Sequence, residues 1–203
     1  MQAGLFAPVA ALQALDLPDA DVHFMQGFYS AEQAQRCFQQ LLSETAWQHE
    51  KLRLWGKWID QPRLTAWYGD EHRSYTYSGL RLQPLPWTPL LERIRQDVQA
   101  CTGDTYNAVL LNLYRNEQDS VAWHSDDEAE LGPQPAIASL SLGATRTFKL
   151  RHKKLGISHS IMLDDGCLLR MAGLTQRCWK HAVLKERNSK GPRINLTFRH
   201  ILR

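Results

Sequence analysis

Residues 137–171 read IASLSLGATRTFKLRHKKLGISHSIMLDDGCLLRM. Short runs of apolar residues, several of them alternating with polar ones, are separated here by turn signals at Gly143 and at Asp164-Asp165-Gly166. Such runs and turns at this spacing favour a β-sandwich or barrel over a doubly wound sheet. Similar short apolar runs separated by turn signals continue on both sides of this stretch. We therefore expect strands at 108–114, 137–142, 146–151, 158–163, 167–171, 181–185 and 193–198.

Two helices are expected ahead of these strands. Ser30 with Gln33 three residues later has the pattern of a capping box, and Thr88 followed by Pro89 is typical of a helix start. Apolar residues at helical spacing follow both starts, and Gly103 would end the second helix. Two helices before the strands would cover one outer face of a sheet. The predicted fold class is mainly β with flanking α.

The bulk composition is that of an ordinary globular protein. The 203 residues suit one domain, which we expect over 1–203 with an N-terminal extension at 1–20 that packs on the surface or frays. No apolar run reaches the length of a membrane span, and the first residues lack the basic region of a secretory signal. We therefore expect a cytoplasmic monomer with reduced thiols, since its four cysteines form no CxxC pair. The net charge of +3 permits nucleic-acid binding without arguing for it.

A candidate metal site stands in VAWHSDDE, residues 121–128. His124 and Asp126 are two residues apart, so in an extended segment they point to the same side. His181 has strand-like flanks and would complete two imidazoles and one carboxylate, the facial triad of non-haem iron(II) oxygenases. An HxD pair also arises by chance. The rival third ligands are His23, His49, His72, His152, His159 and His200.

The segment PRINLTFR, residues 192–199, predicts a strand with two unlike faces. Alternation places Arg193, Asn195, Thr197 and Arg199 on one side. Four polar side chains on an inward face are costly without a partner, and a guanidinium matches a carboxylate in two-point contact. A dicarboxylate co-substrate would be such a partner. The alternative is an edge strand whose polar face meets water.

Together these motifs resemble those of the AlkB family of iron(II)- and 2-oxoglutarate-dependent oxygenases, which carry HxD, a distal His and a terminal RxNxxxR. Asn112-Leu113-Tyr114 is similar to the family's NxY. The resemblance continues through residues 62–70, 74–79, 112–128, 137–153 and 193–199, and is to the branch of AlkB homologues that repair alkylated DNA. It implies a double-stranded β-helix (jelly roll) at 105–203, covered by the N-terminal helices and a nucleotide-recognition hairpin region at 50–80.

The resemblance also implies ligands and a reaction. Fe(II) would bind His124, Asp126 and His181, with no catalytic residue beyond these ligands. Arg193 would pair with the distal carboxylate of 2-oxoglutarate. The remaining co-substrate residues would be Asn112, Tyr114, Asn195, Thr197 and Arg199. With O2, the implied reaction demethylates 1-methyladenine and 3-methylcytosine in DNA and releases succinate, CO2 and formaldehyde.

A damaged base must be flipped out of its stack to reach such an iron. By resemblance, the run Tyr75, Thr76 and Tyr77 would contact and stack on the flipped base, and His124 would form the opposite wall. Asp127 and Glu128 would accept hydrogen bonds from its exocyclic amino group. The alternative for the two tyrosines is ordinary packing, because aromatic residues are common in strands.

Two further segments concern the nucleic acid itself. Trp55, Gly56 and Lys57 align with a hairpin that duplex-acting relatives use as a wedge, so Trp55 would enter the base stack. The alternative is that Trp55 and a neighbouring tryptophan anchor a loop on the core. The basic stretch 146–154 would contact phosphates, with Lys149 and Arg151 on one strand face and Lys153 extending it, or would form a solvated strand face.

Three other functions stay open at this point. The first is demethylation of RNA or of single-stranded nucleic acid by the same chemistry. The second is a protein-directed or small-molecule oxygenase, which predicts no basic surface near the iron. The third is a jelly-roll binding module without catalysis, which predicts no turnover of 2-oxoglutarate.

Overall fold

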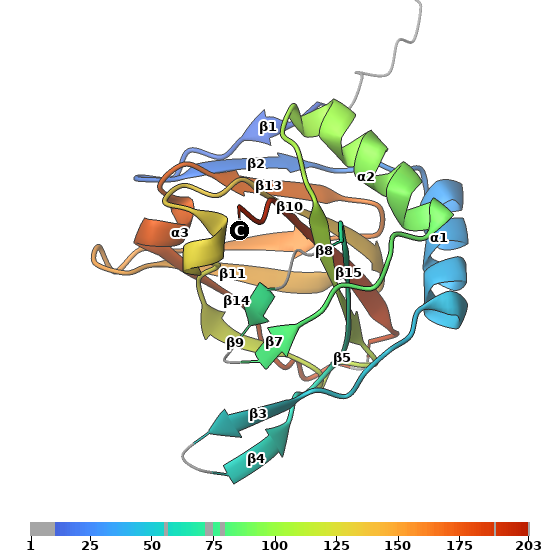
Figure 1. Ribbon diagram of the computed structural model, residues 1–203. Helices are drawn as coiled ribbons and strands as arrows, with labels where there is room; N and C mark the ends of the chain where they lie inside the picture. Colours follow the sequence, from blue (N-terminus) through green and yellow to red (C-terminus); the bar gives the residue numbers. More distant parts are fainter. Residues whose placement is uncertain (1–10, 55–56, 72–74, 78–79, 189, 203) are drawn as a thin grey trace, which may run out of the picture.

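Two β-sheets and two long helices make up most of the computed structural model, which describes residues 11–54, 57–71, 75–77, 80–188 and 190–202 (Figure 1). The major sheet has seven strands in the order β1-β2-β13-β10-β15-β8-β5. The minor sheet has four, in the order β12-β11-β14-β9. Every ladder between these strands is antiparallel, as the predicted jelly roll requires.

The strands of each sheet have the following bounds. The major sheet contains β1 (Gln13–Ala14), β2 (Asp21–Met25), β13 (Leu168–Ala172), β10 (Ile137–Gly143), β15 (Arg193–Arg199), β8 (Ala108–Tyr114) and β5 (Leu64–Gly69). The minor sheet contains β12 (Ser158–Leu163), β11 (Arg146–His152), β14 (Trp179–Val183) and β9 (Val121–His124). Two separate hairpins are β3 (Lys51–Leu54) with β4 (Lys57–Asp60), and β6 (Tyr75–Tyr77) with β7 (Leu80–Leu82). The β3–β4 hairpin projects away from both sheets in Figure 1.

The helices begin and end where the sequence predicts. At α1 (Ala31–Glu44), the Ser30 hydroxyl accepts from Gln33 N while the Gln33 side chain accepts from Ser30 N, which is the complete capping box. Thr88 caps α2 (Pro89–Thr102), and Gly103 ends it in the left-handed conformation with φ of 74°. Two short helices, η1 (Ala129–Leu131) and α3 (Thr175–Cys178), complete the described set. Among the described helices, none is long and apolar enough to cross a bilayer.

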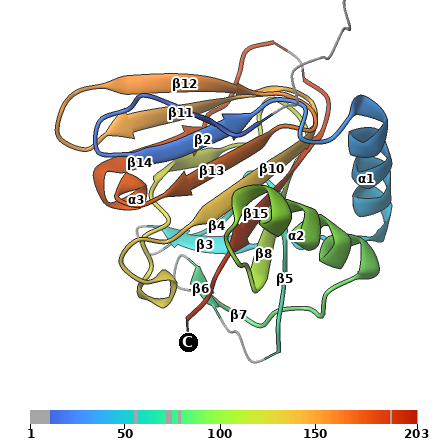
Figure 2. The ribbon, with the colours of Figure 1, turned by 90° about the horizontal axis from the view of Figure 1, so that it is seen from above.

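The apolar side chains form two cores on opposite faces of the major sheet. On the outer face, α1 and α2 pack against strands β8, β10 and β15, so the predicted covering by helices is confirmed (Figure 2). On the inner face, the second core lies between the major and minor sheets. The inner face is also where polar side chains of β8, β10 and β15 meet the minor sheet around a cavity.

The seven predicted strands are all present, with ends that match or shift by at most two residues. The strand expected at 181–185 is β14, which begins at Trp179, and the one expected at 167–171 begins at Leu168. The major sheet is wider than the segment 105–203, because β1, β2 and β5 also belong to it. The run DVHFM of β2 alternates polar and apolar residues, a strand signal that the expectations above did not include. The run LTAWYG of β5 is buried along nearly all its length and therefore shows no alternation.

Candidate metal centre

His124, Asp126 and His181 come together where the minor sheet faces the cavity. His124 ends β9 and pairs in register with His181 on the neighbouring strand β14. One ligand atom from each of the three residues lies within 4.8 Å of the others. His124 Nε2 is 3.7 Å from Asp126 Oδ1, and His181 Nε2 is 4.0 Å from Asp126 Oδ2. Among the described histidines, His181 alone joins the HxD pair in such a group.

These distances and protonation states fit one metal ion. First-row ions hold nitrogen and oxygen ligands at roughly 2.0–2.2 Å, so two ligands of one ion lie no more than about 4.4 Å apart. His124 Nδ1 lies 2.8 Å from Ala122 O, which keeps the proton on Nδ1 and leaves Nε2 free to coordinate. Burial lowers the pKa of His181 to about 3, so its imidazole is neutral at physiological pH.

Asp126 is a buried carboxylate that stays ionised. Burial alone would raise its pKa, but the charge of Arg199 and the two neighbouring imidazoles hold the pKa well below the usual range. Arg199 Nη2 lies 3.1 Å from Asp126 Oδ1. The donor set of two imidazoles and one carboxylate therefore suits Fe(II), with the remaining positions open for a co-substrate and O2.

The loop that carries Asp126 is fixed by contacts outside strand β9. The sequence predicts His124 and Asp126 in one extended segment, but β9 ends at His124. Ser125 Oγ donates to Trp179 O at 2.9 Å. Asp126 N donates to the buried side chain of Gln176 on α3 at 3.0 Å. Neither contact could be anticipated, because α3 is a single turn without a capping signal.

The predicted metal and co-substrate residues all line one cavity between the sheets. They are His124, Asp126, His181, Asn112, Tyr114, Arg193, Asn195, Thr197 and Arg199. The register explains this: on β15 and β8, Arg193 lies opposite Tyr114, and Asn195 lies opposite Asn112. Because β15 pairs with β10 on one side and β8 on the other, the alternative of a water-facing edge strand is wrong.

Arg193 is a buried cation with unused donors. Its side chain is 1% exposed, and Nη2 donates to Ser141 Oγ at 2.8 Å. Nε and Nη1 have no protein hydrogen-bond partner, and the guanidinium carbon lies 5.1 Å from the centre of the Tyr114 ring. Burial lowers the pKa of Arg193, but the group remains cationic at neutral pH. A buried guanidinium of this kind requires an anion, and its two free donors match a carboxylate.

Neighbouring side chains fix the walls of the same cavity. Asn195 Nδ2 donates to Ser139 Oγ at 2.7 Å, and Thr197 Oγ1 donates to Asn195 Oδ1 at 3.1 Å. Arg63, which lies just before β5, donates from Nε to Asn112 Oδ1 at 2.7 Å and also lines the cavity. The sequence gives Arg63 no expected role. It belongs to the stretch 62–70, which carries the family resemblance, but to none of the motifs with an expected function.

The predicted base-contacting residues are only partly described. Asp127 directly follows the candidate ligand Asp126, and Glu128 stands at the N-cap position of η1 without a side-chain capping bond. Trp55 and Gly56 lie outside the described residues. For Lys57 and for the β6 run Tyr75, Thr76 and Tyr77, the structure gives the strand backbone alone. Their contacts with a base therefore remain predictions.

The basic stretch 146–154 divides between the two faces of β11. Lys149 and Arg151 are exposed on the outer face, as predicted. Arg146 is buried and donates to the carbonyl oxygens of Asn116, Asp119 and Leu184, so it serves the fold and is not placed to bind phosphate. Alternation explains the difference, because Arg146 shares the inward face of β11 with the apolar residues.

Comparison with known proteins agrees with this geometry. Residues 21–199 match the family model described as the 2OG-Fe(II) oxygenase superfamily. The chain is 45% identical to human alpha-ketoglutarate-dependent dioxygenase alkB homolog 3 over 86% of its own length and 64% of that protein. It is 42% identical to human DNA oxidative demethylase ALKBH2 over 86% of this chain and 71% of that protein. The chain thus spans less than two thirds of the length of alkB homolog 3.

Solved structures agree on the fold. A protein described as OsALKBH1 superposes with a TM-score of 0.62 at 17% identity, over 93% of this chain and 99% of that one. A prolyl hydroxylase from Trichoplax adhaerens superposes with a TM-score of 0.59 at 12% identity, over 89% and 83%. At these identities the likeness concerns the oxygenase fold alone.

Proposed function

Because this chain belongs to the AlkB homologues of the 2OG-Fe(II) oxygenase superfamily, we propose that it demethylates N-alkylated bases such as 1-methyladenine and 3-methylcytosine in DNA. The observation that carries the oxygenase part is Arg193, a buried guanidinium with two free donors in the cavity that contains the iron triad. The DNA part rests on the relatives, of which one is described as a DNA oxidative demethylase.

The side chains of the cavity have different roles in this reaction. When bound, Fe(II) with 2-oxoglutarate and O2 supplies hydroxylation of the N-methyl group, which then leaves as formaldehyde and restores the base. Arg193 binds the distal carboxylate of the co-substrate, and Tyr114 and Asn112 line its flank. Asn195 and Thr197 keep the pocket rigid through their contacts with each other and with β10. The base approaches where His124 and Asp127 are partly exposed, at 27% and 61% of their side chains.

The outer face of the minor sheet supports contact with a nucleic-acid backbone. Lys149 and Arg151 on β11 and Lys180 on β14 are exposed, and Arg151 lies directly across from Lys180. The Arg151 guanidinium stacks on the Trp123 ring at 4.5 Å. Cations beside an aromatic ring give a salt-sensitive affinity for phosphate chains that does not depend on sequence.

Formaldehyde release tests the proposal. The purified chain with Fe(II) and 2-oxoglutarate is given oligonucleotides that contain 1-methyladenine or 3-methylcytosine, as single-stranded DNA, duplex DNA and RNA, with unmethylated strands and His181→Ala as controls. We expect release from methylated DNA by the wild type alone. Succinate formation without formaldehyde from any methylated strand would overturn demethylation and leave an oxygenase with another substrate. Release from RNA alone would replace DNA as the substrate.

Strand preference tests the predicted wedge separately. Trp55→Ala should weaken demethylation in duplex DNA far more than in single strands, because a wedge is needed only where a base is stacked and paired. An equal loss on both substrates would assign Trp55 to anchoring its loop.

A further inference from the structure

Three consecutive residues after His124 are held by the segment 176–179 and by Lys153, which itself bonds to that segment. Ser125 and Asp126 bond to Trp179 and Gln176, as described above. The third is Asp127, whose Oδ2 lies 3.5 Å from Lys153 Nζ. The same ammonium donates to the backbone oxygen of Gln176 at 2.9 Å. Lys153 therefore bridges the turn that holds Asp126 and the carboxylate of the next residue.

The turn from which Lys153 projects is itself fixed. Lys153 directly follows β11, and its backbone N donates to Cys178 O at 2.8 Å. The buried His152 accepts backbone hydrogen bonds at Nδ1 from Lys154 N at 3.1 Å and Leu155 N at 3.0 Å. These bonds fix the backbone at Lys153 and on its C-terminal side. The side chain therefore starts from a fixed point, and its ammonium is held by Gln176 O and Asp127.

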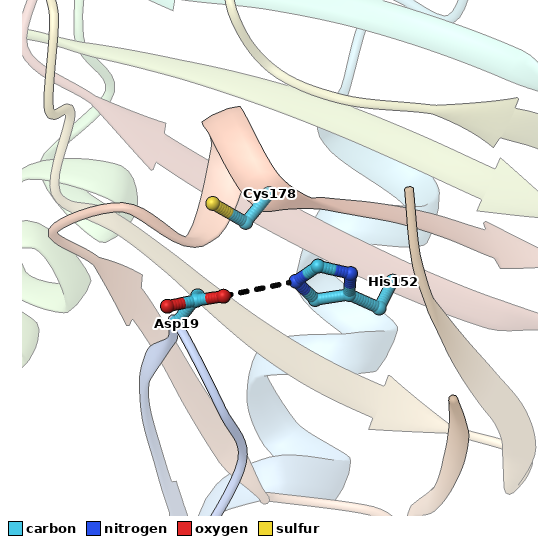
Figure 3. Close-up of side chains that lie close together, drawn as sticks. All are labelled: Asp19, His152 and Cys178. Carbon is cyan, nitrogen blue, oxygen red and sulfur yellow. Dashed lines mark ion pairs between the residues drawn. The ribbon is translucent and has the colours of Figure 1, made fainter. Parts of the chain in front are cut away.

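Asp19, His152 and Cys178 form a second group of metal-ligand types beside this turn (Figure 3). His152 Nδ1 is occupied by two N–H donors, so the ring proton of the neutral imidazole is on Nε2. That nitrogen lies 3.3 Å from Asp19 Oδ2 but makes no hydrogen bond to it. A metal at Nε2 would have to displace this proton. The group therefore fits a structural support of the Lys153 turn better than a cation site.

We propose that Lys153 is a positioning residue that selects lesions with an exocyclic amino group. This inference rests on the proposed demethylation. Asp127 carries an acceptor-only carboxylate beside the iron ligand Asp126, and Lys153 fixes where that carboxylate points. The amino groups of 1-methyladenine and 3-methylcytosine can donate to it. 3-Methylthymine carries only oxo groups, which cannot donate and leave the carboxylate without a donor.

A different role for Lys153 makes a different prediction. If its ammonium binds the DNA backbone, as its place at the end of a basic stretch allows, it contributes equally to every lesion. Its loss would then raise KM for all oligonucleotides, and the loss would grow smaller at high salt. Positioning of Asp127 predicts a loss confined to amino-bearing lesions.

The experiment compares Lys153→Ala with Lys154→Ala, which removes the same charge from the adjacent exposed residue. Matched oligonucleotides carry 3-methylcytosine or 3-methylthymine at one position. We expect Lys153→Ala to lower kcat/KM for 3-methylcytosine by roughly 5- to 20-fold, the size of one misplaced polar contact in a transition state. The value for 3-methylthymine and the KM for 2-oxoglutarate should stay the same. Lys154→Ala should leave the ratio of the two lesions unchanged.

Two further variants complete the test. Lys153→Arg keeps a donor and should restore most of the discrimination. Lys153→Ala made in an Asp127→Asn background should cause little additional loss, because the two residues act as a pair. Equal losses on both lesions, or additive losses in the double variant, would overturn the inference while wild-type turnover upheld demethylation. Absence of wild-type turnover on every methylated strand would instead overturn the proposed function.

Discussion

Arg199 and Asp126 form a buried ion pair, with Nη2 3.1 Å from Oδ1 and both side chains less than 5% exposed. Removing one partner of such a pair costs about 3–5 kcal/mol, because the other charge is left buried without compensation. Arg199→Met should therefore lower the free energy of unfolding of the metal-free protein by about that amount. Added Mn(II) should reduce the loss, since the ion replaces the missing positive charge beside Asp126.

Urea denaturation with and without Mn(II) measures this prediction. Arg199→Lys is the matched variant, because it keeps a charge and should lose less. An identical loss in the presence and absence of the ion would show that Arg199 does not act through Asp126.

Metal binding itself should stabilise the chain. A ligand that binds the folded state alone adds about 2.7 kcal/mol at a concentration 100 times its Kd. Fe(II) under anaerobic conditions, or Mn(II), should thus raise Tm by several degrees in the wild type. Asp126→Asn should remove the shift, because an amide oxygen is a weaker ligand than a carboxylate. A persistent shift in this variant would place the metal elsewhere, and thermal denaturation measures the outcome.

Arg193 should decide the affinity for 2-oxoglutarate. A hydrogen bond to a charged group contributes roughly 1.5–3 kcal/mol, so Arg193→Met should raise KM for the co-substrate by about 10- to 100-fold. The measurement is succinate formation against 2-oxoglutarate concentration. Monocarboxylic 2-oxo acids are the control, because they lack the carboxylate that Arg193 would bind. A similar loss with these acids would contradict the assignment.

Asp119 should make part of the stability depend on pH. Burial tends to raise the pKa of this carboxyl, but hydrogen bonds from Arg115 and the charge of Arg146 outweigh it and lower the pKa. A lowered folded-state pKa gives stability that is present above the unfolded value of about 3.9 and is lost as pH falls through the folded value. The stability difference between wild type and Asp119→Asn should therefore shrink below about pH 4.

Free energies of unfolding at several pH values between 7 and 3 measure this effect. Arg115→Gln should reduce the same pH dependence in part, because it removes the two side-chain hydrogen bonds and the charge that lower the Asp119 pKa and keeps the bond from the Arg115 backbone. A wild-type to Asp119→Asn difference that stays constant over the range would contradict the prediction.

The sequence predicts which side chains line the cavity better than it predicts the contacts that hold those side chains in place. Local signals were enough for the helix caps and for the polar face of β15, because capping and alternation act over a few residues. The contacts of Gln176 with Asp126 and of Arg63 with Asn112 join positions about fifty residues apart. No local pattern encodes such pairs, and they depend on how the two sheets close. The wide major sheet escaped prediction for the same reason, since β2 joins it only through pairing with the distant β13.

Strand β15 has a consequence for how this protein tolerates change. Its odd-numbered positions from Arg193 to Arg199 line the cavity, while Ile194, Leu196 and Phe198 are buried in the core beneath the helices. Substitutions along one seven-residue strand should thus sort by parity: the even positions affect mainly the stability of the fold, and the odd positions affect mainly turnover. Arg199 is the exception, because its ion pair with Asp126 gives it a part in both properties.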